Sequence, residues 1–262
     1  MRPPFHAIFY TDRALGSLGL GRPNSEGKAR GSVEAFHKIS VPDVTPYCVA
    51  NELICGELGR FLTLPIPPLS LTYSEFTGET TAIFSCLDFS WNSERLINAE
   101  PDQCVACDLR LCTGLALFDI LIANPDRLPW NIKVDRPLNP TDIRVFDHEQ
   151  ALFGDEGEPR LSRLWDGIGI SWKWGDGEHC LMEYLESGKF MPDWLHRIAC
   201  IPQWFIRHCC QRMVDNGITQ PEADAAVQFL THRRATLEAI IGRNRDWFPE
   251  SFWKPKAGEL FQ

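Results

Sequence analysis

Three polar residues, Asp126, Asn131 and Asp147, have types and spacing that suit the transfer of a phosphoryl group. Asp126 and Asn131 lie five positions apart in Asn-Pro-Asp-Arg-Leu-Pro-Trp-Asn, and Asp147 follows a short apolar run. Such a transfer requires an acidic group that positions the acceptor hydroxyl, together with oxygen ligands for Mg²⁺. Asp126 is therefore the candidate base, and Asn131 and Asp147 are the candidate metal ligands.

The elements around these residues can bring them together. The apolar run Leu115–Ala123 predicts a buried helix that ends at a polar loop, and Pro129 argues against regular helix in that loop. Residues 131–134 and 143–146 read as two short strands joined by a turn. The resulting hairpin would return Asp147 to the loop.

An ordinary structural explanation exists for each residue taken alone. Asp126 and Arg127 could form a surface ion pair, Asn131 could cap a turn, and Asp147 could be a solvated carboxylate. The three occur together, in order and flanked by apolar strands, and this combination favours the functional interpretation.

An upstream lysine and a carboxylate extend the hypothesis. Lys38 lies in the predicted strand Ser32–Ser40, and Glu52 lies on the predicted helix Tyr47–Leu64. In kinases, a strand lysine that contacts the α- and β-phosphates is oriented by a carboxylate on a helix. Lys38 with Glu52 fits this pair, and Glu57 on the same helix is the competing partner.

A glycine-rich stretch follows the predicted first strand, residues 5–10. Its glycines are Gly16, Gly19 and Gly21, a spacing that matches no standard phosphate-binding motif. Backbone N–H groups of such a turn can approach phosphates closely, and these glycines are candidate nucleotide-binding residues. A flexible turn between two strands explains the stretch equally well.

The chain resembles the HipA-like kinases, which share a core with protein and phosphoinositide kinases. The resemblance covers roughly residues 33–153 and rests on NPDRLPWN, on VFDHEQALF, and on Lys38 with the Asn-Glu-Leu motif that contains Glu52. Leu128 departs from the family pattern, which usually has His there.

The resemblance implies an α+β, two-lobed kinase-like fold. It places a small strand-rich N-lobe at residues 1–88 and a mostly helical C-lobe at residues 89–262, with a hinge near Ser85–Phe89. It also implies Mg²⁺-dependent transfer from ATP to a hydroxyl acceptor, most commonly Ser or Thr of a protein. The family's link with toxin–antitoxin systems raises the possibility of a regulatory protein partner.

Two other functions are consistent with the same residues. Some kinase-like proteins transfer a nucleotidyl group in place of a phosphoryl group. The other hypothesis is a non-catalytic nucleotide-binding or interaction module, and it is motivated by Leu128 and by the irregular glycine spacing.

Composition narrows the class of protein. The 262 residues are 44% hydrophobic and 23% charged, which is typical of globular proteins, and the net charge of −9 argues against direct nucleic-acid binding. No apolar run is long enough to span a membrane, and the N-terminus shows no secretory signal, so we expect a cytoplasmic protein without membrane association.

The ten cysteines include one C-x-x-C, Cys104 to Cys107, without a second pair, which disfavours a structural zinc.

The remainder is predicted to be mainly helical. A stretch holding Trp165, Trp172 and Trp174 receives no assignment. The predicted C-terminal helices are His179–Ser187, Pro192–Cys200, Pro202–Asn216 and Pro221–Arg243.

Overall fold

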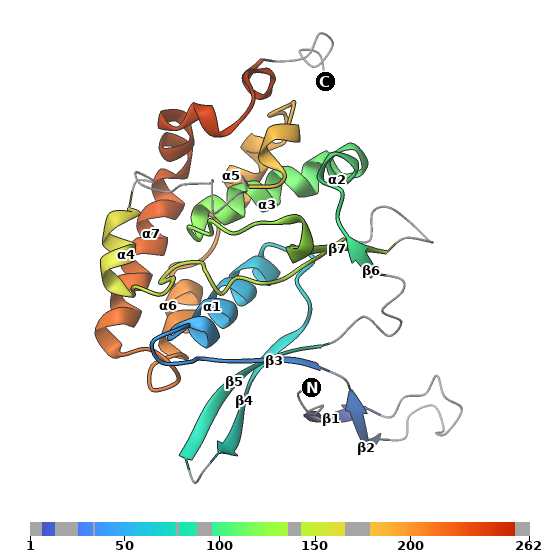
Figure 1. Cartoon of the computed structure of the whole chain (residues 1–262), viewed down its shortest axis with the longest axis vertical. Coiled ribbons are helices and arrows are strands. Elements are labelled where there is room, and N and C mark those ends of the chain that lie inside the picture. The colour runs from blue at the N-terminus through green and yellow to red at the C-terminus, as the bar shows by residue number, and fades with distance from the viewer. Residues whose placement is uncertain are drawn as a thin grey trace.

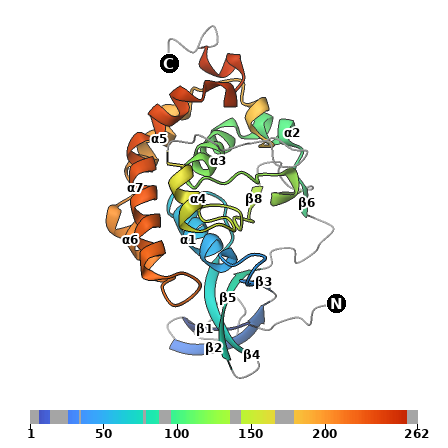
Figure 2. The ribbon, with the colours of Figure 1, turned by 60° about the vertical axis from the view of Figure 1, so that its left-hand side comes forward.

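The computed structural model describes residues 7–13, 26–33, 35–76, 79–87, 96–135, 143–165 and 179–254. Most strands gather at one end of the molecule and most helices at the other, with helix α1 (Cys48–Phe61) between them (Figures 1 and 2). The predicted α+β architecture, with a strand-rich N-terminal part and a mostly helical C-terminal part, is confirmed.

The N-terminal part contains two antiparallel sheets. Strand β1 (Ala7–Arg13) pairs with β2 (Glu26–Val33), and a second sheet has the order β3-β5-β4. Its strands are β3 (Ala35–Ile39), β4 (Leu69–Phe76) and β5 (Glu79–Leu87). The single strand predicted over Ser32–Ser40 is thus divided between β2 and β3, and Lys38 lies opposite Phe84 of the central strand.

Helix α1 packs against this sheet along a close contact that glycine permits. A Cβ atom at Gly56 would lie 2.3 Å from the side chain of Leu69, so a larger residue would require that side chain to move. The helix also contacts α6 (Gln203–Gln211), which belongs to the C-terminal part. It buries two polar residues, Asn51 and Glu52, together with most of its apolar side chains.

The C-terminal part is built around helix α3 (Leu109–Leu121). Residues 112–121 of this helix are all buried, as expected for a helix that is apolar on every side. The other α-helices are α2 (Pro101–Cys107), α4 (Glu158–Arg163), α5 (Met191–Ala199), α6 (Gln203–Gln211) and α7 (Gln220–Arg243), and the short 3-10 helices are η2 (Pro129–Asn131), η3 (Met182–Tyr184), η4 (Arg245–Trp247) and η5 (Glu250–Trp253).

The helix predicted over His179–Ser187 is wrong. Only the 3-10 turn η3 forms there, and the N–H groups of Met182, Tyr184 and Leu185 donate to carbonyls three residues earlier. Residues 179–182 are all buried, which differs from the one-sided burial of a surface helix.

The predicted hairpin is present as part of a third sheet. Strand β7 (Ile132–Asp135) pairs with β8 (Ile143–Val145), and β6 (Leu96–Asn98) pairs with the other side of β7, all antiparallel. Strand β6 lies within residues 90–103, a polar segment for which the sequence predicts a linker with a short helix, and helix α2 begins at the end of this segment. None of the described helices is both long and apolar enough to cross a membrane.

Candidate active site

Lys38 lies among three carboxylates that come from two distant parts of the chain. Its Nζ atom donates to Glu52 Oε1 at 2.6 Å, to Asp147 Oδ1 at 2.6 Å and to Glu149 Oε2 at 3.1 Å. Burial alone would lower the pKa of Lys38, but the Glu52 and Asp147 carboxylates outweigh it and the pKa is raised. The lysine is therefore a fixed cation held in the site by its partners.

The structure distinguishes the two helix carboxylates that the sequence left open. Glu52 is 2% exposed and bonds Lys38, whereas Glu57 bonds Arg212 NH1 at 3.1 Å. Burial would raise the pKa of Glu52, but Lys38 and His148 lower it to about 2, so the carboxylate stays ionised. His148 lies on the other side of Glu52, with its Nδ1 atom 3.5 Å from Glu52 Oε2.

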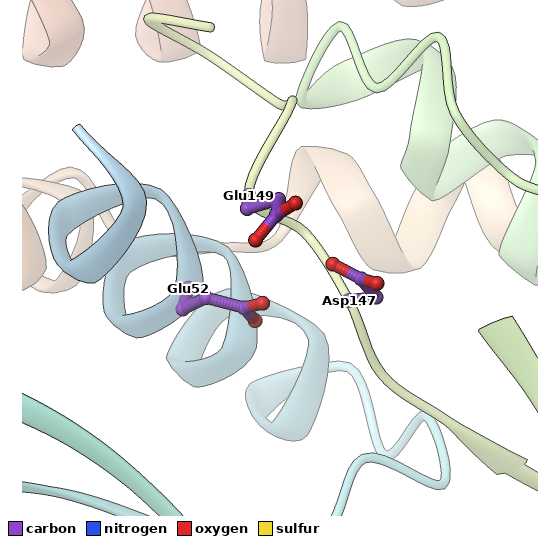
Figure 3. A group of neighbouring side chains, drawn as sticks. All are labelled: Glu52, Asp147 and Glu149. Carbon is purple, nitrogen blue, oxygen red and sulfur yellow. The ribbon is translucent and has the colours of Figure 1, made fainter. Parts of the chain in front are cut away.

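Asp147 and Glu149 follow β8 on a segment with unusual backbone geometry. Asp147 has φ +66°, a left-handed conformation that a non-glycine residue adopts only at a local cost. The side chains of Asp147 and Glu149 both reach Lys38, whereas the side chain of His148 between them is buried. Figure 3 shows the carboxylates of Glu52, Asp147 and Glu149 around one shared space, and one oxygen from each lies within 4.8 Å of the other two.

Asn51 fixes the segment that carries these acids. Its Nδ2 atom donates to the carbonyl of Glu149 at 2.6 Å, and its Oδ1 atom accepts from the backbone N–H of Phe153 at 3.3 Å. Asn51 is fully buried, so both bonds are made away from water. The Asn-Glu dipeptide of α1 thus braces the acidic segment with one residue and orients Lys38 with the next.

Asp126 and Asn131 lie on the loop that follows α3. Asn131 is 1% exposed, and its Nδ2 atom donates to the carbonyl of Asp126 at 2.7 Å, which leaves the amide oxygen as the atom that can ligate a metal. Burial and then the Asp147 carboxylate raise the pKa of Asp126. A raised pKa makes the Asp126 carboxylate a stronger proton acceptor.

A fully buried ion pair holds this loop against the rest of the site. Arg127 donates to Asp119 from Nε at 2.8 Å and from NH2 at 2.9 Å, and its NH1 donates to the carbonyl of Phe146 at 2.7 Å. Asp119 also accepts from Asn124 and contacts His179 Nε2 at 3.1 Å. Arg127 therefore joins the Asp126 loop to the residue that precedes Asp147.

Sequence reasoning missed Glu149 and the residues of this buried network. Glu149 had a weak signal, an acid two positions after Asp147. Asp119 had a stronger one, because a carboxylate inside an otherwise apolar helix needs a partner. His179 lies 60 positions from Asp119, and no local pattern connects them.

An aromatic ring lies near Lys38 on the same face of β3. Phe36 is 61% exposed, although Phe84 and Cys86 of the neighbouring strand are 6% and 7% exposed. Side chains two positions apart in a strand share a face, so Phe36 and Lys38 point the same way. Phe36 is thus an exposed apolar side chain beside two buried ones on the face that carries Lys38.

Several of the remaining predictions concern residues outside the part of the chain that the structure describes. Gly16, Gly19 and Gly21 lie outside the described residues, as do Phe89 of the expected hinge, Trp172 and Trp174. All ten cysteines are free, and within the described part of the chain Cys104 and Cys107 join no group of three metal-capable side chains.

The comparisons with known proteins show the fold. No protein-family model and no curated protein sequence matches the chain. Among solved structures, it is similar to the Helicobacter pylori proinflammatory kinase CtkA, with a TM-score of 0.53 and 13% identity over 82% of this chain and 91% of that one. It also matches HipA of Shewanella oneidensis MR-1, solved with HipB and operator DNA, with a TM-score of 0.44 and 13% identity over 82% of this chain and 60% of that one. The similarity to CtkA shows a kinase-like fold.

Proposed function

We propose that this protein transfers the γ-phosphoryl group of ATP to a hydroxyl acceptor, Ser or Thr of a protein, with Mg²⁺ bound in the site. The observation that carries the proposal is the meeting of Lys38, Glu52, Asp147 and Glu149 within hydrogen-bonding distance. Lys38 comes from a strand, Glu52 from a helix, and the other two from the segment after β8. This combination provides a cation for phosphate oxygens and acids for a metal.

The donor set fits Mg²⁺, which prefers oxygen ligands. Asp147 and the amide oxygen of Asn131 would hold the ion, and Glu149 offers a further carboxylate beside Asp147. Bound Mg²⁺ neutralises charge on the phosphate oxygens. Lys38 would donate to the phosphates, which requires it to exchange Asp147 and Glu149 for phosphate while Glu52 continues to orient it.

Asp126 would position the acceptor hydroxyl and accept its proton. Its carboxylate is half-buried, and its raised pKa suits proton transfer. The buried Asp119–Arg127 pair fixes the loop backbone. We propose that residues 1–88 and 89–262 form the two lobes that enclose this site.

The direct test supplies the purified chain with Mg²⁺, γ-labelled ATP and a mixed protein lysate. We expect label on Ser or Thr side chains, and we expect EDTA to abolish it. Label that reaches the acceptor from α-labelled ATP would instead indicate nucleotidyl transfer. Nucleotide binding without any transfer would indicate a non-catalytic module.

A second prediction compares the two helix carboxylates. We expect Glu52→Gln to lower kcat/KM for ATP by about 10- to 100-fold, because Lys38 loses a buried charged hydrogen bond that orients it. Glu57→Gln is the matched control, and we expect a change within about twofold, since an exposed pair such as Glu57–Arg212 contributes little. Steady-state kinetics at saturating Mg²⁺ measures both. A larger loss in Glu57→Gln would assign the orienting role to Glu57.

A further inference from the structure

Trp130 is an exposed tryptophan inside the loop that carries the proposed catalytic residues. It lies between Asp126 and Asn131 in the short helix η2, and its side chain is 56% exposed. A single exposed apolar side chain is common on protein surfaces and indicates nothing alone. The position of Trp130, next to one proposed metal ligand and four residues after the proposed base, is what sets it apart.

The backbone on both sides of Trp130 is held in place. The N–H of Ala99 donates to the carbonyl of Pro129 at 3.3 Å, and the N–H of Asn131 donates to the carbonyl of Leu128 at 2.9 Å. Pro129 further restricts the loop, because its ring fixes φ. The backbone that carries the exposed indole is therefore fixed by hydrogen bonds on both sides of Trp130.

The charges on the elements packed around η2 favour a cationic ligand for this ring. Glu100 and Asp102, at the start of α2, are exposed, and Asp126 is half-buried in the same loop. Among the described cations near this loop, Arg127 is buried against Asp119, and Lys133 of β7 donates to the neutral amide of Asn98 and keeps its charge. Glu100, Asp102 and Asp126 outnumber Lys133, and an indole face attracts a Lys or Arg side chain by a cation–π interaction.

We propose that Trp130 selects the acceptor by stacking on a Lys or Arg side chain that lies close in sequence to the acceptor Ser or Thr. The proposal rests on the proposed function, because it assigns one end of the acceptor to the Asp126 loop. It defines the substrate class as a protein segment that carries a hydroxyl and a neighbouring positive charge. Trp130 would be a specificity residue that takes no part in the transfer itself.

The test uses Ser/Thr peptide libraries in which one flanking position is fixed as Arg, Leu or Glu. We expect the wild type to prefer the Arg libraries, and Trp130→Ala to lose about 3- to 30-fold of its kcat/KM on those libraries alone. Trp130→Phe should retain part of the preference. Trp204→Ala is the matched control, since Trp204 is 67% exposed on α6, outside the loop, and should leave the preference unchanged.

Two further measurements separate this proposal from the proposed function. Affinity for Mg²⁺–ATP and the urea midpoint of unfolding should be the same in Trp130→Ala as in the wild type. If the wild type phosphorylates no library, phosphoryl transfer is wrong, and fluorescence anisotropy of labelled Arg peptides still decides the role of Trp130. Weaker Arg-peptide binding in Trp130→Ala would support it. An unchanged preference, in transfer or in binding, would overturn it.

Discussion

Asp126→Asn and Asp147→Asn should each reduce phosphoryl transfer by more than a hundredfold, but only Asp147→Asn should change how the nucleotide binds. A positioned general base contributes about 10²- to 10⁴-fold, and Asp126 is the half-buried carboxylate whose pKa the site raises. Asp147 would hold the metal, which stabilises transition-state charge by several kcal/mol. Both substitutions should therefore reduce phosphoryl transfer, Asp126→Asn because the base is lost and Asp147→Asn because a metal ligand is lost.

Nucleotide titrations with and without Mg²⁺ distinguish these causes. In Asp126→Asn, Mg²⁺ should strengthen ATP binding as it does in the wild type. In Asp147→Asn, most of this strengthening should be lost. Glu250→Gln provides the control, because Glu250 is an exposed acid near the C-terminal end of the described chain, paired with Lys254. Normal transfer by Asp147→Asn would rule out the proposed metal site.

Asp119→Asn should lower the free energy of unfolding by about 3–5 kcal/mol, the cost of removing one partner of a buried ion pair. Asp119 and Arg127 are both fully buried. Burial alone would raise the pKa of Asp119, but Arg127 and His179 outweigh it and lower the pKa. An asparagine would leave the Arg127 charge without compensation. Its NH2 group also could not accept the hydrogen bonds that Asp119 accepts from Arg127 and Asn124.

Urea unfolding followed by circular dichroism measures this change. Asp193→Asn is the matched control, because Asp193 forms a pair with Arg110 in which both side chains are more than 40% exposed. We expect it to cost no more than about 1 kcal/mol. Equal losses in the two variants would mean that the Asp119–Arg127 pair contributes no more than a surface pair.

The sequence predicted the elements whose signal is local. The apolar helix α3, the hairpin of β7 and β8, and helix α7 each carry their own periodicity or turn residues, and all are present. Thr219 is the N-cap residue of helix α7, and its N–H donates to Glu222 in a capping box. Such patterns need no knowledge of distant residues.

The unpredicted features depend on distant contacts or on backbone geometry. The segment after His179 forms only a 3-10 turn, and it is buried through contacts such as the bond from the Cys180 N–H to the Arg127 carbonyl, far away in the sequence. Glu149 joins the site because Asp147 adopts a left-handed conformation, which residue type alone does not reveal. The choice between Glu52 and Glu57 required Arg212, 155 positions from Glu57.

The two bonds of Asn51 to the acidic segment have a mechanical consequence. Because Asn51 and Glu52 are consecutive residues of α1, any shift of this helix carries the Lys38 partner and the Glu149 backbone in the same direction. The helix is further tied to the C-terminal part by Tyr47, whose hydroxyl donates to Glu222 at 2.6 Å, and by the Glu57–Arg212 pair. Helix α1 and the acidic segment therefore keep their mutual spacing as one body, and the carboxylates that surround Lys38 share a single support.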